Sequence, residues 1–149
     1  MNTRSRMMAS IRSKNTQPEL TVRHALHALG IRYRLHSKRL SGKPDLVLRR
    51  FHAVILVHGC FWHGHRCRFF RLPSSRRGFW RTKINSNRLR DRRTEQALQL
   101  AGWRTMTVWE CAVREATPAD VRRLARRIEH WLYTNKRYGV VTGSKRPAT

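Results

Sequence analysis

The sequence predicts an α/β sandwich, in which helices flank one mixed β-sheet. Helical and strand-like hydrophobic patterns follow one another in the order helix, strands, helix, strand, helix. Residues 53–57 are continuously apolar (Ala-Val-Ile-Leu-Val), which is typical of a central strand buried on both faces. Residues 117–132 place their apolar side chains on a single stripe, as expected of a helix that packs against a sheet.

The first helix is expected to begin at Thr16. Thr16 and Glu19 have the spacing of a capping box, and Pro18 suits the first turn of a helix. Gly30 is the expected end of this helix. Residues 31–35 then alternate between apolar and polar side chains, which indicates a half-buried strand.

The middle of the chain contains two short strands and a long aperiodic segment. Strands are expected at residues 45–48 and 53–57, and they lie close enough in sequence to form a hairpin. Residues 58–78 show no periodicity and are rich in Cys, His, Phe, Trp and Arg, so they are expected to form a loop. A long charged helix over residues 81–101 and a strand over residues 103–109 follow.

The charge of the chain points to a polyanionic partner, with nucleic acid as the first choice. The 149 residues include 33 Lys and Arg but only 8 Asp and Glu, which gives a net charge of +25. The chain is 40% apolar and has five tryptophans, so it can build a core, and the charge is not a sign of disorder. A purely structural basic protein fits poorly, because Cys and His residues are clustered in one segment.

The length is that of one domain. We expect a basic arm over residues 1–15, one folded domain over residues 16–133, and a basic, disordered tail over residues 134–149. No apolar run approaches the roughly 20 residues of a membrane span, and the first residues lack the apolar segment of a secretory signal. The three cysteines are an odd number, which disfavours a disulfide framework. We therefore expect a monomer in the cytoplasm, with no membrane partner.

Cysteine and histidine residues form a candidate zinc site. Cys60 and Cys67 flank His63 and His65, and Cys111 follows the last predicted strand. Zinc prefers four thiolate or imidazole ligands at tetrahedral corners, and in this loop it would act as a structural staple. Two histidines compete for the fourth position; His65 can turn to the same ion as Cys67, which leaves His63 free. The alternative is three buried cysteines that pack as small apolar side chains.

Asp45 is a candidate magnesium ligand, because it stands in Gly-Lys-Pro-Asp at the start of an apolar strand. Turn chemistry explains an aspartate beside proline equally well. Glu19 can cap its helix and still face Asp45, and His63 and His58 are either general bases or packed polar residues. We assign no chemistry to the remaining acidic residues, which have the positions of helix-face or capping charges: Asp91, Glu95, Glu110, Glu115, Asp120 and Glu129.

Two runs carry a resemblance to a known family. Residues 42–48 read Gly-Lys-Pro-Asp-Leu-Val-Leu, and residues 57–67 read Val-His-Gly-Cys-Phe-Trp-His-Gly-His-Arg-Cys. With Gly-Trp-Arg at residues 102–104 and Val-Trp-Glu-Cys at residues 108–111, they resemble the very-short-patch repair (Vsr) DNA mismatch endonucleases. The likeness extends over residues 4–133.

This resemblance implies a restriction-endonuclease-like core of the PD-(D/E)xK type and a strand-nicking, magnesium-dependent DNA endonuclease. Its substrate would be double-stranded DNA with a T·G mismatch left by deamination of 5-methylcytosine, cut on the thymine strand in very short patch repair. The resemblance also implies cooperation with a mismatch-repair matchmaker protein. The alternatives are a restriction-type or mobile-element nuclease of the same fold, and a non-catalytic DNA-binding module on a decayed nuclease fold.

The resemblance also implies roles for single residues near the candidate magnesium ligand. Asp45 matches the magnesium-binding aspartate, and Glu19 matches a helix glutamate that reaches the metal through water. His63 matches the catalytic histidine, with His58 as a supporting residue. Val57 stands where well-known members have threonine. If that threonine binds the metal through its backbone carbonyl, valine can replace it; if its hydroxyl matters, activity would be weaker.

The same likeness implies a structural zinc site and a DNA-intercalating group. The four residues that match the zinc ligands are Cys60, His65, Cys67 and Cys111. Phe61, Trp62 and Trp80 match an aromatic wedge that enters DNA from the major groove beside the mismatch. Met8 falls in the arm that would lie on the minor-groove side.

Overall fold

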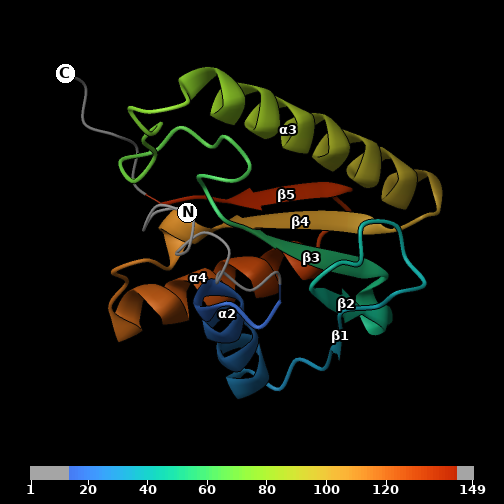
Figure 1. The fold of residues 1–149 in the computed structure, drawn as a ribbon. Coiled ribbons are helices and arrows are strands. Elements are labelled where there is room, and N and C mark those ends of the chain that lie inside the picture. The colour runs from blue at the N-terminus through green and yellow to red at the C-terminus, as the bar shows by residue number, and fades with distance from the viewer. Residues whose placement is uncertain (1–13, 144–149) are drawn as a thin grey trace.

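The computed structural model describes residues 14–143, and these residues form one mixed five-stranded sheet between helices (Figure 1). This architecture confirms the α/β class that the order of patterns predicts. The helices and strands are α2 (Gln17–Ala28), β1 (Arg34–Leu35), β2 (Leu46–Leu48), β3 (Ala53–His58), α3 (Arg77–Leu100), β4 (Arg104–Trp109), α4 (Pro118–Leu132) and β5 (Tyr138–Val141).

The strands lie side by side in chain order. β1 and β2 are antiparallel, as are β2 and β3, which confirms the expected hairpin. β3, β4 and β5 run parallel to one another. β3 is therefore the central strand, as its continuous apolar run predicts.

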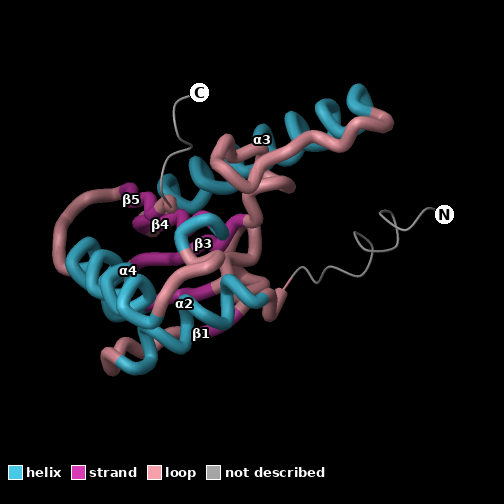
Figure 2. Tube along the Cα trace, turned by 90° about the vertical axis from the view of Figure 1, so that its left-hand side faces the viewer, coloured by secondary structure: helices cyan, strands magenta, loops and turns pink. Residues whose placement is uncertain are grey.

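The two faces of the sheet are covered by different helices. Figure 2 shows α3 on one side of the strands and α2 with α4 on the other. Along β3, Ala53 and Ile55 face the main core, while Val54 and Leu56 face Leu98 of α3. The main core also includes these residues of α2 and α4: Val22, Leu26, Leu124, Ala125, Ile128, Trp131 and Leu132. The strand thus buries both of its faces.

Helix α3 is long and mostly exposed. It spans 24 residues, of which only Ile84 and Leu98 are buried. It begins at Arg77, four residues before the expected start at residue 81, so Trp80 belongs to the first turn of the helix rather than to the preceding loop. Within residues 14–143, no helix is both long enough and apolar enough to cross a membrane.

The two capped helices differ in how they use their acidic residue. In α4, Thr117 and Asp120 form a complete capping box. In α2, the Thr16 hydroxyl accepts from the Glu19 N–H as predicted. The Glu19 carboxylate, however, accepts from the N–H of Asn15 and does not complete a box with Thr16. Its position instead leaves it at the end of the sheet, where the candidate active site lies.

The segment after α4 differs from the loose tail that the sequence analysis expects from residue 134. Residues 138–141 form β5, which extends the sheet beside β4, and Val141 is buried there. The periodicity was too weak to predict this strand, because Tyr138 and Val140 remain exposed and Gly139 lies between them. The first expected strand is shorter than its pattern, since only Arg34 and Leu35 pair with β2.

Arg104 holds the end of α4 against the sheet. Its guanidinium lies over the Trp131 ring, 4.7 Å from the centroid. It donates hydrogen bonds to five backbone carbonyls, those of Phe51, Trp131, Leu132, Thr134 and Lys136. These bonds satisfy carbonyls at the helix end and fix the turn that leads into β5.

We expect Arg104→Met to lower the free energy of unfolding by about 2–3 kcal/mol, because a charged donor is lost from several carbonyls at once. Urea unfolding followed by circular dichroism measures the change. Arg122→Met, on the exposed face of α4, is the matched control and should stay within about 0.5 kcal/mol of the parent chain. Equal stabilities for the two variants would contradict the role of Arg104.

Candidate active site and metal centre

The candidate active site lies where β3 extends beyond β2. β2 begins at Leu46, which pairs with Ile55, so the last residues of β3 have no partner strand on that side. The Asp45 carboxylate takes the place of the missing strand, because its Oδ2 accepts a hydrogen bond of 2.7 Å from the Val57 N–H. The structure thereby brings two predicted site residues, Asp45 and Val57, into direct contact.

Glu19 joins this site from α2, together with a histidine that the sequence analysis did not select. Glu19 is only 1% exposed, and its Oε1 is hydrogen-bonded to Nε2 of His36. Glu19, His36 and Asp45 each offer a ligand atom, and these atoms lie within 4.8 Å of one another. Two carboxylates with an imidazole nitrogen are a donor set that fits a divalent cation.

Burial disfavours the ionised form of the Asp45 carboxyl group. It raises the pKa of Asp45 to about 6, and the nearby charge of Glu19 acts in the same direction. The hydrogen bond from Val57, and positive charge on His36 or His63, lower this pKa. A cation bound between the two acids would offset their repulsion, so the electrostatics agree with a metal-binding role for Asp45.

His63 lies beside this site and is oriented by two neighbours. Its Nδ1 is 2.5 Å from Oδ2 of Asp91, and its ring stacks on that of His58 with 3.9 Å between centroids. Burial lowers the pKa of His58 to about 4, and the charge of His63 contributes. His58 is therefore neutral near pH 7, whereas His63 has a carboxylate as its partner.

The sequence analysis missed Asp91, although α3 contains a signal for it. Ile84, Asn87 and Asp91 follow helical spacing and share one face of the helix. Ile84 is buried, and the Asn87 amide donates to the Trp62 carbonyl. Asp91 continues this inward-facing row, which places its carboxylate beside His63.

His58 and His63 line a cleft of about 470 Å³ with a strongly basic wall. The basic side chains that line it are Arg66, Arg88 and Arg92. Asp91 and Glu95 also line the cleft, so its three arginines leave an excess of positive charge, which suits a phosphate group.

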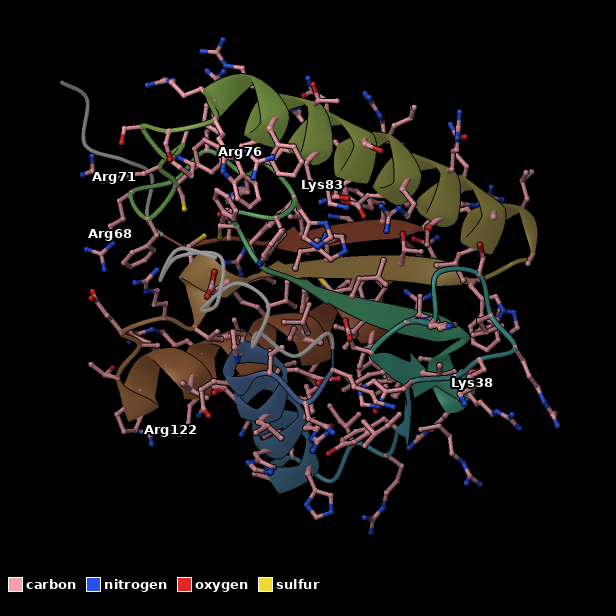
Figure 3. All side chains as sticks on the ribbon, in the orientation of Figure 1. Lys38, Arg68, Arg71, Arg76, Lys83 and Arg122 are labelled. Atoms are coloured by element: carbon pink, nitrogen blue, oxygen red, sulfur yellow. The ribbon has the colours of Figure 1, made fainter. Side chains whose placement is uncertain are left out.

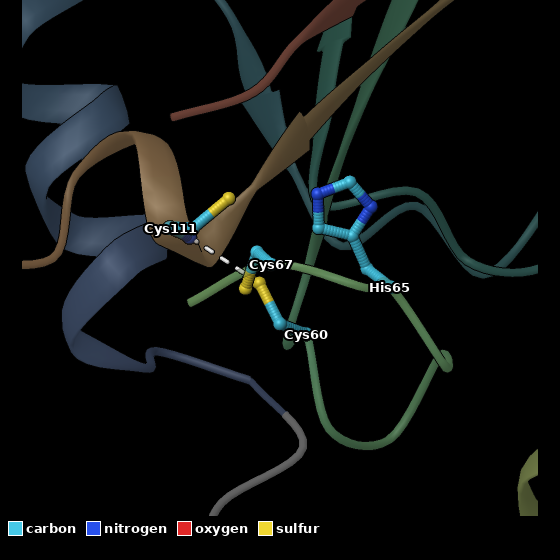
Figure 4. Close-up of side chains that lie close together, drawn as sticks. All are labelled: Cys60, His65, Cys67 and Cys111. Carbon is cyan, nitrogen blue, oxygen red and sulfur yellow. Dashed lines mark hydrogen bonds between the residues drawn. The ribbon is translucent and has the colours of Figure 1, made fainter. Parts of the chain in front are cut away.

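The four predicted zinc ligands converge at one point (Figure 4). Ligand atoms of Cys60, His65, Cys67 and Cys111 lie within 4.8 Å of one another. His63 is bound to Asp91 instead, so the geometry separates the two histidines that competed for this position. Three thiols and one imidazole fit the tetrahedral donor set of zinc. Burial raises the pKa of the Cys60 thiol, and the neighbouring thiols act in the same direction.

The segment after β5 closes this Cys/His cluster. The Gly143 N–H donates to Sγ of Cys111 at 3.3 Å, and the Thr142 hydroxyl lies 3.0 Å from Nε2 of His65. A Cβ on Gly143 would stand 2.3 Å from the Cys111 carbonyl oxygen, so only glycine fits. The sequence analysis missed both residues because it placed them in a disordered tail.

The predicted wedge aromatics gather beside the cluster. The Phe61 ring is 5.3 Å from that of Trp62 and 5.4 Å from that of Trp80, between centroids. All three side chains are partly exposed. Met8, the fourth residue expected to contact DNA, lies outside the described residues. The loop between β3 and α3 also carries exposed basic side chains, of which Figure 3 labels Arg68, Arg71 and Arg76.

Comparison with known proteins identifies the family. The family model described as DNA mismatch endonuclease Vsr matches residues 1–69. The chain is 40% identical over 130 residues to the DNA mismatch endonuclease Vsr of Escherichia coli, which covers 87% of this chain and 83% of that protein. The chain belongs to the Vsr family.

Other relatives of this Vsr chain are named as nicking enzymes. It is 49% identical over 116 residues to Type II nicking enzyme V.XorIIP of Xanthomonas oryzae pv. oryzae, covering 78% of this chain and 85% of the relative. It is 42% identical over 128 residues to Type II nicking enzyme V.NmeAIP of Neisseria meningitidis, covering 85% and 91%. The resemblance stated from the motifs is thus confirmed, and Vsr membership implies a DNA endonuclease with a nuclease fold.

We expect Asp45→Asn to stabilise the protein at neutral pH when no magnesium is added. The folded pKa of about 6 lies above the ordinary 3.8, so ionisation of Asp45 destabilises the fold as pH rises through 6. The gain should build up between pH 3.8 and 6, be complete at pH 7, and vanish only well below pH 3.8, where the aspartate is protonated in both states. Urea unfolding at several pH values measures it.

Asp120→Asn is a control for which we expect the opposite change in stability. The hydrogen bonds of its capping box lower the pKa of Asp120, so this variant should lose stability at pH 7. An Asp45→Asn variant that is less stable than the parent chain at pH 7 would contradict the electrostatic account.

We expect His65→Ala to lose bound zinc and to melt at a lower temperature, because a structural zinc site needs its fourth ligand. His63→Ala, two residues away, should keep the zinc. Elemental analysis of the two purified variants, with thermal melts, distinguishes them. Zinc loss in His63→Ala alone would show that the ligand assignment is reversed.

Proposed function

We propose that this chain is a magnesium-dependent endonuclease that nicks the thymine strand of DNA at T·G mismatches arising from deaminated 5-methylcytosine. One observation carries the proposal: Asp45, Glu19 and the His63–Asp91 pair meet at the end of β3. Family membership supports the reaction and the substrate class. The relative from Escherichia coli is named a DNA mismatch endonuclease, which supports a mismatch as the substrate.

The acidic residues supply the metal-binding part of the site. Asp45 would hold magnesium, with the backbone carbonyl of Val57 as a further ligand and Glu19 shaping the hydration shell. Bound magnesium would neutralise charge on the scissile phosphate and lower the pKa of the attacking water. A backbone carbonyl is present whatever the side chain, so valine at position 57 is compatible with this role.

The histidine pair supplies the proton-transfer part. The Asp91 carboxylate accepts from Nδ1 of His63, which fixes the tautomer whose Nε2 is free to take a proton. His58 stacks on this ring and stays neutral, so it supports the orientation of His63 without adding a competing charge. His63 is therefore the proposed general base.

The Cys/His cluster and the aromatic residues would recognise the mismatched base pair. Zinc bound by Cys60, His65, Cys67 and Cys111 would fix the loop that carries Phe61 and Trp62. Opening a mismatched step costs at most a few kcal/mol, and stacking on the exposed bases returns about 1–3 kcal/mol per base. With Trp80, the two loop aromatics would form a wedge in the major groove, and Met8 would lie on the minor-groove side.

The surrounding charge supplies affinity without sequence preference. Phosphate contacts from lysine and arginine fix the position of the protein on DNA, while base contacts give specificity. A net charge of +25 fits this role. We also propose, on the resemblance alone, that a mismatch-repair matchmaker protein is a partner.

The test is nicking of a labelled duplex with one T·G pair, beside a matched T·A duplex. We expect magnesium-dependent cutting of the thymine strand of the first duplex only. Asp45→Ala should lower the rate on the order of a thousandfold or more while mismatch binding persists, because a metal ligand acts on the charge that develops at the phosphate.

The other outcomes point to the alternative functions. Equal cutting of the two duplexes would refute the mismatch role and favour a restriction-type nuclease. Binding without cutting in any divalent cation would refute the enzymatic role and favour a decayed nuclease fold. Normal nicking by Asp45→Ala would refute the metal assignment.

A further inference from the structure

His36 lies directly opposite Asp45 in the sheet. β1 and β2 pair in the register Arg34 with Val47 and Leu35 with Leu46, so the next pair outward is His36 with Asp45. The backbone confirms this placement, because the His36 N–H donates to the Asp45 carbonyl at 3.1 Å. The ring of His36 is thereby held at the end of the sheet where the acidic residues meet.

The backbone of His36 is in the left-handed region, with φ of 46°. This conformation is uncommon for residues other than glycine and costs about 1–2 kcal/mol. Such strain persists only where the surrounding contacts enforce it, and it is concentrated at functional sites. At His36 the enforcing contacts are the backbone bond to Asp45 and the side-chain bond to Glu19.

Among residues 14–143, the Glu19 carboxylate has two hydrogen-bond partners, and His36 is one of them. Its Oε2 accepts from the backbone of Asn15, and its Oε1 contacts Nε2 of His36. A carboxylate only accepts, so the hydrogen must be on Nε2. Since Glu19 is almost completely buried, removal of the imidazole would leave an unpaired oxygen beside the negative charge of Asp45.

We propose that His36 is a positioning residue of the catalytic site, which holds the Glu19 carboxylate so that it and Asp45 face the same divalent cation. This inference rests on the proposed function, in which Asp45 and Glu19 serve the magnesium ion. The His36 side chain is 21% exposed, so its ring lies between the buried Glu19 and solvent.

The experiment compares His36→Ala with His36→Gln in the zinc-loaded full chain. Binding of Mn²⁺, used as a paramagnetic substitute for magnesium, is measured by electron paramagnetic resonance, and nicking is measured against magnesium concentration. We expect His36→Ala to weaken Mn²⁺ binding about 10–100-fold, as loss of a group that orients a metal-site residue does. His36→Gln should recover most of this loss, because its amide N–H can reach Glu19.

His52→Ala is the matched control. His52 also has a left-handed backbone, with φ of 51°, and it immediately precedes β3, at the opposite end from the site. Its ring stacks on Trp103 with 4.4 Å between centroids. This variant should bind Mn²⁺ as the parent chain does, and thermal melts of all variants separate metal binding from stability.

Two results would overturn the inference. Unchanged Mn²⁺ binding in His36→Ala would show that Glu19 needs no positioning. Nitrogen coupling from His36 in the Mn²⁺ spectrum, with His36→Gln as defective as His36→Ala, would make His36 a direct ligand. Asp45→Ala tests the parent proposal separately, because undiminished Mn²⁺ binding in that variant would refute the metal site itself.

Discussion

The hydrogen bond from the Val57 N–H to the Asp45 carboxylate determines where the parts of the site meet. It exists because β2 stops short of the end of β3, which leaves a backbone donor without a strand partner. The bond joins the residue that precedes β2 to the end of β3, where α2 contributes Glu19 and the β3–α3 loop contributes His63. If β2 continued along β3 here, a strand carbonyl would accept from the Val57 N–H, and the Asp45 carboxylate would lose this hydrogen bond.

The features that sequence predicted best are those with local causes. Helix α4 has its capping box and its apolar stripe within 16 residues, and β3 is marked by a continuous apolar run. The Cys/His cluster was also predictable, because Cys60, His65 and Cys67 fall within eight residues and zinc chemistry restricts the ligand types. The family resemblance added the proposed metal-site roles of Asp45 and Glu19, since turn chemistry and helix capping account equally well for these residues in the sequence alone.

The features that sequence missed depend on distant pairing. His36 reaches the candidate site because the strand register places it opposite Asp45. Asp91 reaches it because α3 packs over the loop that carries His63. β5 has one fully buried residue, Val141, so its hydrophobic pattern is too weak to distinguish it from a loop. In each case the deciding partner lies in a different element of the fold, and local periodicity carries no information about such pairing.

The contacts of Thr142 and Gly143 with the Cys/His cluster have a consequence for solubility. β5 is the outermost strand and covers one edge of β4, whose residues are mostly buried. It is fastened at its far end by the bonds to His65 and Cys111, and at its near end by the turn that Arg104 holds. If the cluster loosens, β4 becomes a bare edge of unpaired N–H and C=O groups, which is a template for intermolecular strand pairing. The Cys/His cluster thus helps to keep the edge of β4 covered, in addition to fixing the loop that carries Phe61 and Trp62.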